Sequence, residues 1–223
     1  MASGDFGRTE RIGSIVGGVI RQAVRDTGAR GVALLDDASP EARLALAWSV
    51  AALGADAVIP VPVPDSTAID GFRALGLAPP DLPRDRLVEE LHRAVGRLVA
   101  ADRDALLAHP ANKTALLLGA APPPEPLLPL GDLYASQVAE LAGGWTAPAA
   151  VRRLADRVGG IDRLDAALMR WAEERRPAPE AFAPLGDAAD DLTAALEAAR
   201  FARRRLGVVP KLGTRTLGID LFG

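Results

Sequence analysis

The spacing of apolar residues near the start of the chain predicts a helix, a strand and a second helix. Apolar residues recur every three or four positions over residues 10–27, which is typical of an amphipathic helix. Four consecutive apolar residues at 32–35 then predict a short buried strand. Ser39 is a good N-cap and Pro40 suits the first helical position, so we expect a helix that begins there and ends at about Leu53.

A second strand is predicted over residues 57–63. Pro60 and Pro62 lie two residues apart, so both missing N–H groups face the same side. This pattern predicts a strand at the edge of its sheet. A strand, a helix and another strand in succession indicate a parallel sheet, and we therefore expect an α/β fold with a Rossmann-like sheet and flanking helices.

The rest of the chain reads mainly as helix. We expect a single domain over residues 1–223, with a nucleotide-binding core at 1–142 and a helical part with a tail at 143–223. Asp132 is expected to cap the helix that follows it. The expected elements are a helix over 84–101, a strand over 105–108, an irregular proline-rich loop over 120–130, and helices over 133–142, 149–158, 162–174 and 188–205.

Composition narrows the possible functions. The chain has no cysteine, which excludes disulfides, thiolate zinc sites and cysteine nucleophiles. No basic start leads into an apolar stretch, and no run approaches the roughly 18 apolar residues of a membrane helix, so we expect a cytoplasmic protein without a membrane partner. The formal net charge of -3 argues against nucleic acid as a partner.

Two stretches of the chain, 112–119 with 128–138 and 203–206 with 209–212, resemble the ammonia-dependent NAD synthetase family. Residues 112–119 (Asn-Lys-Thr-Ala-Leu-Leu-Leu-Gly) and 128–138 (Leu-Pro-Leu-Gly-Asp-Leu-Tyr-Ala-Ser-Gln-Val) are similar to its patterns Asn-Lys-Ser/Thr-Glu and Pro-Leu-Gly-Asp-Leu-Tyr-Lys-Thr-Gln-Val. Residues 203–206 and 209–212 are similar to its C-terminal His-Lys-Arg-Arg segment. The resemblance implies a fold of the adenine-nucleotide α-hydrolase type and a homodimer.

The resemblance also implies a reaction. In that family ATP adenylates the nicotinate carboxylate of deamido-NAD, ammonia replaces the adenylate, and pyrophosphate leaves from a Ser-Gly-Gly-x-Asp-Ser loop after the first strand. ATP and magnesium are the implied cofactors, and deamido-NAD or NAD is the implied ligand.

The pyrophosphate loop is degenerate in this chain. It should fall where the sequence has Asp37, Ala38 and Ser39, so a carboxylate replaces the first serine and both glycines are lost. Glu41 stands near the family's magnesium-linked aspartate, and Ala115 replaces the glutamate that follows Lys-Thr. A phosphate loop needs glycines so that backbone N–H groups can close on the oxygens. We therefore expect impaired catalysis, and we assign no catalytic residue and no metal ligand.

Several candidate residues have two interpretations. Asn112, Lys113 and Thr114 are either a nucleotide-contacting turn at the end of a central strand or a polar helix N-terminus at the surface. Asp132 belongs to the same candidate nucleotide-binding set, although a helix cap is the favoured interpretation. Tyr134, the single tyrosine, is expected to pack with its hydroxyl at the surface.

The basic residues near the C-terminus are also open to two interpretations. Arg203, Arg204 and Lys211 are either an anion-binding tail or a solvated helix end placed favourably against its own dipole. The leading function is an NAD synthetase-like protein with impaired catalysis. The alternative is a non-catalytic nucleotide-binding, scaffold or accessory protein that could pair with a true synthetase.

Overall fold

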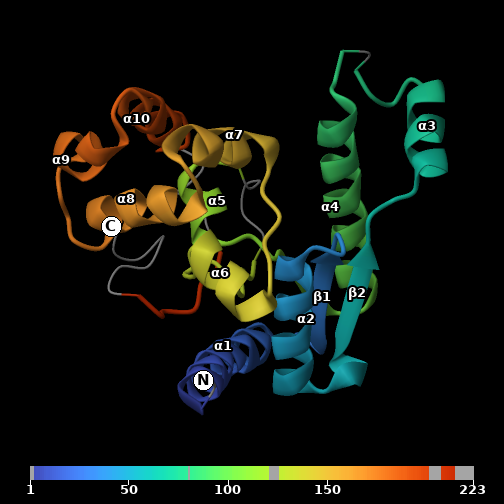
Figure 1. Cartoon of the computed structure of the whole chain (residues 1–223). Helices are drawn as coiled ribbons and strands as arrows, with labels where there is room; N and C mark the ends of the chain where they lie inside the picture. Colours follow the sequence, from blue (N-terminus) through green and yellow to red (C-terminus); the bar gives the residue numbers. More distant parts are fainter. Residues whose placement is uncertain (1–2, 80, 121–125, 201–206, 214–223) are drawn as a thin grey trace.

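The computed structural model describes residues 3–79, 81–120, 126–200 and 207–213. Figure 1 shows a sheet with its helices on one side of the molecule and a group of helices on the other. The elements are α1 (Ser3–Thr27), β1 (Gly31–Asp36), α2 (Pro40–Leu53), β2 (Val58–Pro62), α3 (Ser66–Ala74), α4 (Arg84–Asp102), β3 (Ala105–Ala108), α5 (Lys113–Leu117), α6 (Ala135–Ala142), α7 (Ala149–Val158), α8 (Ile161–Ala172), α9 (Ala178–Phe182) and α10 (Ala188–Ala198).

The three strands form a parallel sheet in the order β2-β1-β3. In the register, Val32 of β1 lies opposite Val58 of β2 and Leu106 of β3. β2 is therefore an edge strand among the described residues, which confirms the expectation from Pro60 and Pro62. The predicted α/β class, with a parallel Rossmann-like sheet and flanking helices, is also confirmed.

The sheet continues beyond β3 through two isolated bridges. Leu127 pairs in parallel with Ala108 on one side and with Val208 on the other. The loop predicted over 120–130 is thus not wholly irregular, because Leu127 is fully buried and its backbone extends the sheet. The same pairing fixes the start of the C-terminal segment 207–213 against the core.

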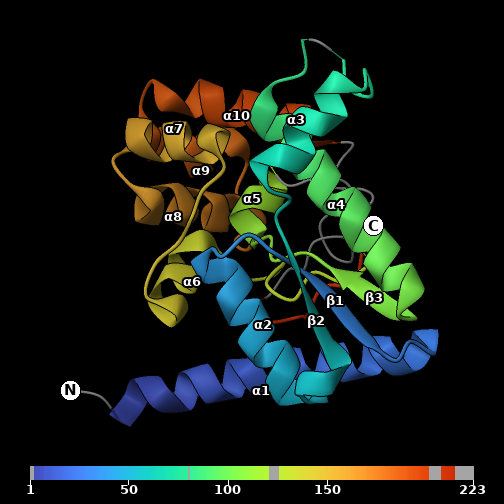
Figure 2. The same ribbon diagram turned by 90° about the vertical axis from the view of Figure 1, so that its right-hand side faces the viewer.

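Alternate side chains of β1 bury into different layers, as a strand requires. Val32 and Leu34 belong to the core that α1 and α2 share with the sheet. Ala33 and Leu35 belong to the opposite layer, beneath α4. Gly96 lets α4 approach closely, since a Cβ there would lie 2.5 Å from a methyl group of Leu35. Figures 1 and 2 show α4 standing against the sheet on the side away from α2.

A third core fills the helical part. Its fully buried side chains come from α5, α8 and α10 and include Leu117, Leu164, Leu168 and Leu192. α6 contacts both α2 and α8, so it connects this part to the sheet. No helix in the described ranges has both the length and the apolar character to cross a membrane.

Several predicted boundaries need correction. The helix expected from 133 begins at Ala135, with Tyr134 at the N-cap position, so the interpretation of Asp132 as the cap is wrong. α10 ends at Ala198, short of the predicted 205, although residues 201–206 lie outside the described ranges. α3 was not predicted, because Ile69 is its single buried residue and one buried position gives no helical pattern.

Candidate functional site

A cavity of about 440 Å³ opens at the carboxyl ends of the strands. It is bordered by the β1–α2 loop, the first half of α4, the segment after β3, and residues 146–149 at the start of α7. Open parallel sheets bind their ligands at this edge. Of the predicted site residues, Asp37, Ser39, Glu41 and Asn112 line the cavity together.

The β1–α2 loop satisfies its own N–H groups. The N–H of Ala38 donates to Asp36 Oδ1 at 2.9 Å, and the N–H of Ser39 donates to Asp37 Oδ1 at 3.0 Å. Ser39 Oγ then accepts from the N–H of Ala42 at 3.1 Å, which caps α2 as predicted. The backbone N–H groups that a bound anion would need are therefore already bonded to carboxylates and a hydroxyl of the chain itself.

Glu41 is buried, with 4% of its surface exposed, and acts as a bridge between two segments. Both carboxylate oxygens lie 3.1 Å from the N–H of Thr146, and Asn112 Nδ2 approaches Oε1 at 3.5 Å. Burial raises the pKa of Glu41 above its ordinary value, against the opposing effect of these hydrogen bonds. This carboxylate ties α2 to the chain ahead of α7.

The charge of the cavity wall is predominantly negative. Four carboxylates line it, together with one arginine, Arg86, and two histidines. Burial also raises the pKa of Glu89. The carboxylates are those of Asp37, Glu41, Asp85 and Glu89. A polyanion such as a triphosphate would meet net repulsion in this cavity.

The two histidines at the cavity have backbone partners that the sequence did not reveal. His92 Nε2 lies 2.6 Å from the carbonyl oxygen of Val61. His109 Nδ1 accepts the N–H of Ala111 at 3.0 Å, and burial lowers the pKa of His109 to about 4. His109 is therefore neutral at pH 7, and its proton is on Nε2.

Lys113 does not line this cavity. Its side chain is fully buried, and Nζ lies 2.7 Å from Asp132 Oδ1 and 2.6 Å from Glu173 Oε1. The same ammonium sits 5.1 Å from the ring centre of Tyr134, whose hydroxyl donates to Glu173 Oε1 at 3.2 Å. The expectation that this hydroxyl reaches the surface is wrong, because only 3% of Tyr134 is exposed.

Asp132 holds the C-terminal segment. Its Oδ2 atom accepts the N–H groups of Leu212 and Gly213 at 2.6 and 2.5 Å. With Lys113 on its other oxygen, Asp132 connects α5 to residues 207–213. Asp132 therefore has a structural role, because both of its carboxylate oxygens are bonded within the protein.

Thr114 also bonds within the protein. Its hydroxyl donates to Asp165 Oδ1 at 2.6 Å and accepts the N–H of Ala135 at 2.9 Å. Asp165 Oδ2 accepts the N–H of Ser136 at 2.7 Å, and burial raises the pKa of Asp165. These bonds join α5, α6 and α8 at one point.

The remaining predicted site residues, those of the candidate anion-binding tail, do not line the cavity in the described part of the chain. Arg203 and Arg204 lie outside the described residues, while Lys211 is described and exposed. Within the described ranges, no group of three or more histidine, aspartate or glutamate residues lies close enough to hold a metal ion.

Comparison with solved structures identifies the type of fold. The chain is similar to an NH3-dependent NAD synthetase from Campylobacter jejuni subsp. jejuni NCTC 11168 in complex with the nitrate ion, with a TM-score of 0.65 and 16% identity over 87% of this chain and 95% of that one. It is also similar to an NMN synthetase from Francisella tularensis, with a TM-score of 0.58 and 12% identity over 84% of this chain and 95% of that one. No protein-family model and no curated protein matches the sequence.

The chain therefore has an NAD synthetase-like fold, as the sequence resemblance implied. At identities of 16% and 12%, this likeness defines the fold alone.

Proposed function

We propose that this protein is an NAD synthetase-like protein in which the ATP-dependent amidation of deamido-NAD is impaired. The observation that carries the proposal is the β1–α2 loop, where Asp36 and Asp37 take the N–H groups of Ala38 and Ser39. In this fold the loop lies where a phosphate group would meet the start of a helix.

The energetic consequence is large. Two unit charges of like sign at ~4 Å repel by roughly 4 kcal/mol at an effective dielectric constant of about 20. Loss of even one preorganised donor to a developing anion typically costs ~10²–10³ in rate. Both effects act on the same transition state, so they need not add, but they have the same sign.

ATP with magnesium fits the described residues poorly. Magnesium prefers several oxygen ligands, and the Glu41 carboxylate is already engaged by Thr146 and Asn112. Ala115, at the cavity wall, offers no ligand where the family pattern has a glutamate. We therefore derive no catalytic step through either group.

The alternative function is that of a non-catalytic nucleotide-binding, scaffold or accessory protein. The cavity favours the binding version, because about 440 Å³ is enough for a small organic ligand and many of its lining side chains are apolar. Deamido-NAD or NAD is the candidate ligand by analogy with the fold. Under either function, catalytically impaired or non-catalytic, we propose that the protein is a homodimer in the cytoplasm.

A coupled assay for NAD formation with ammonia, deamido-NAD and ATP-Mg tests the proposal. We expect no measurable turnover from the native chain. We also expect none from the triple variant Asp37→Ser/Ala38→Gly/Ser39→Gly, because Ala115 would still leave magnesium poorly held. Turnover near 1 s⁻¹ by the native protein, within the ordinary range for enzymes, would show that the proposal is wrong.

Calorimetric titration separates the two versions. Deamido-NAD that binds without turnover would support a non-catalytic binding protein. Absence of binding by both deamido-NAD and ATP-Mg would favour the scaffold or accessory version.

A further inference from the structure

The α4 wall of the cavity at the carboxyl ends of the strands carries two polar side chains that the proposed function does not use. They are Glu89 and His92, and both line the cavity. Because they are three positions apart on a helix, they lie on the same face of α4. Their hydrogen-bonding capacity indicates what kind of ligand could meet them there.

His92 offers the cavity a hydrogen-bond acceptor. The residue is only 7% exposed, and its Nε2 atom lies 2.6 Å from the carbonyl oxygen of Val61. A carbonyl oxygen can only accept, so in the neutral ring Nε2 carries the proton and Nδ1 carries the lone pair. Nδ1 has no hydrogen-bond partner in the part of the chain that the structure describes, and the space that this ring borders is the cavity.

Glu89 offers a carboxylate that no cation of the chain neutralises directly. Its side chain is partly buried and makes no hydrogen bond or ion pair with any described residue. Burial raises the pKa of Glu89, and Arg93, the cation that counters this effect most, is itself 2.6 Å from Glu90 Oε1. A cation in the cavity would supply the partner that Glu89 lacks.

The rest of the wall suits an apolar body with one positive charge. Carboxylates outnumber cationic side chains around the cavity, and His109 adds no charge at pH 7 because burial lowers its pKa to about 4. The volume of about 440 Å³ lies within the ordinary range for small-molecule sites. Between the polar groups the wall is formed by apolar side chains, which include Val63, Val88, Pro110, Ala111, Ala147 and Pro148.

We propose that this cavity binds a small organic amine, whose ammonium group donates to the Glu89 carboxylate and to His92 Nδ1 while its apolar body lies against Val88 and the other apolar side chains. An ammonium group has only donors to offer, and the two side chains on this face of α4 offer only acceptors. A carboxylate or phosphate ligand would instead place acceptors opposite acceptors. The inference goes beyond the proposed function, which assigns no amine to this protein, and it rests on that function only in treating the same cavity as the ligand site.

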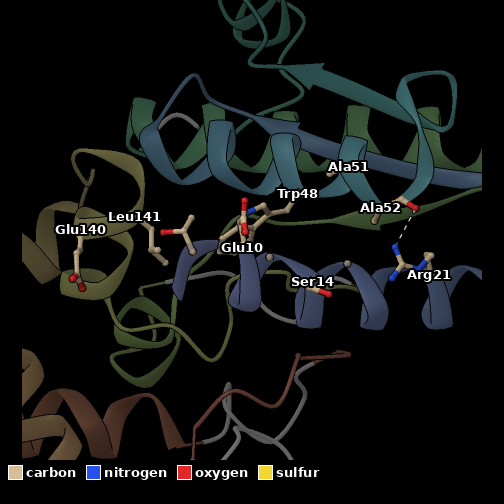
Figure 3. A pocket seen from close by; sticks show the side chains of 11 residues that line it. Glu10, Ser14, Arg21, Trp48, Ala51, Ala52, Glu140 and Leu141 are labelled. Carbon is tan, nitrogen blue, oxygen red and sulfur yellow. Dashed lines mark hydrogen bonds between the residues drawn. The ribbon is translucent and has the colours of Figure 1, made fainter. Parts of the chain in front are cut away.

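A second hollow, beside α1, provides an internal control. It has a volume of about 690 Å³ and is also lined by carboxylates, those of Glu10 and Glu140. Figure 3 shows Glu10 on α1 with Trp48 of α2 across from it, and Arg21 donating to the carbonyl oxygen of Ala52. An amine attracted merely by negative charge and apolar surface could bind in this second hollow, so the experiment has to separate the two places.

Calorimetric titration of the full chain near neutral pH tests the ligand class with three probes that share one indolylethyl body. They are tryptamine, which is a cation, tryptophol, which is neutral, and indole-3-propionate, which is an anion. We expect tryptamine to bind, tryptophol to bind at least roughly tenfold more weakly, and indole-3-propionate to show no binding, because the charge-assisted hydrogen bonds need the ammonium group.

One pair of matched substitutions tests the place of binding. Glu89→Gln keeps the size of the side chain and removes its charge, and it should weaken tryptamine binding roughly tenfold. Glu10→Gln makes the same chemical change in the hollow beside α1 and should leave the affinity within about twofold. Glu89→Gln should be at least as stable to urea as the native protein, because the removed charge has no partner to lose, so weaker binding cannot be ascribed to unfolding.

Several outcomes would overturn the inference: no binding of tryptamine, binding of indole-3-propionate as tight as that of tryptamine, or an affinity for tryptamine that Glu89→Gln leaves unchanged. Loss of binding in Glu10→Gln alone would place the amine beside α1 and would also overturn it. A native chain that neither binds tryptamine nor makes NAD would remove this inference and leave the proposed function intact. A chain that makes NAD, and in which Glu89→Gln weakens tryptamine binding, would do the reverse.

Discussion

Replacing Lys113 with methionine is the most informative test of the structural interpretation. The Lys113 ammonium is fully buried and lies 2.7 Å from Asp132 and 2.6 Å from Glu173. Lys113→Met keeps most of the side-chain length and removes the charge. The variant leaves two carboxylates without their shared cation.

The expected cost follows from burial. Removing one partner of a buried ion pair typically destabilises a protein by about 3–5 kcal/mol, because the remaining charge stays uncompensated. Asp132 keeps the N–H groups of Leu212 and Gly213, and Glu173 keeps the Tyr134 hydroxyl. We therefore expect the lower part of that range, about 3 kcal/mol. A typical total stability is roughly 5–15 kcal/mol, so the loss is a substantial fraction of the whole.

Urea unfolding followed by circular dichroism measures this change. The control is Arg84→Met, which breaks an ion pair with Asp70 that is 50% and 63% exposed and should cost less than about 1 kcal/mol. Lys113→Met/Asp132→Asn should be at least ~1 kcal/mol more stable than the sum of the single changes, since the two residues are coupled. A loss below 1 kcal/mol in Lys113→Met would refute the burial argument and return Lys113 to the set of ligand-facing residues.

Two further predictions concern the cavity. Ala38 has a φ of 60°, a left-handed conformation that glycine adopts more readily, so Ala38→Gly should raise the free energy of unfolding by about 0.5–1 kcal/mol. A lower urea midpoint in the variant than in the native protein would contradict this. Burial lowers the pKa of His109 from 6.5 to about 4, so the folded state resists its protonation, and protonation would break the bond from Ala111. The resulting stability is complete above pH 6.5 and is lost as pH falls to about 4, by up to ~3 kcal/mol. His109→Gln should remove this dependence, and parallel pH profiles for the two proteins would show that His109 is not its source.

The sequence predicted the elements whose determinants are local. Ser39 and Pro40 mark the start of α2 through capping and a fixed φ, and both act within one turn of the helix. β1 was visible because its burial on both faces requires an unbroken apolar run. α3 was missed because it makes few buried contacts, although Asp65 does cap it.

The interactions that the sequence did not reveal are long-range. Lys113 is bonded to Asp132, which is 19 residues away in the sequence, and to Glu173, which is 60 residues away. No short-range spacing pattern could have predicted these two pairs. Glutamates at the end of a helix, such as Glu173 directly after α8, normally indicate a solvated surface. Asp132 was interpreted as a helix cap because it precedes an apolar run, yet its carboxylate is taken by Lys113 and by the C-terminal segment.

The geometry explains why the sequence can resemble NAD synthetases closely at motifs that build the fold, while we propose that the activity is impaired. The motif residues Lys113, Thr114 and Asp132, which carry much of the resemblance, bond within the chain and hold α5, α6, α8 and the C-terminal segment together. Two positions that depart from the family pattern, Asp37 and Ala115, line the cavity. A match at residues that build the fold predicts the fold, and chemistry has to be argued from the residues that can touch a ligand. Substitutions at Lys113 and Thr114 therefore test folding first, whereas substitutions at Asp37 and Ala115 test ligand binding directly.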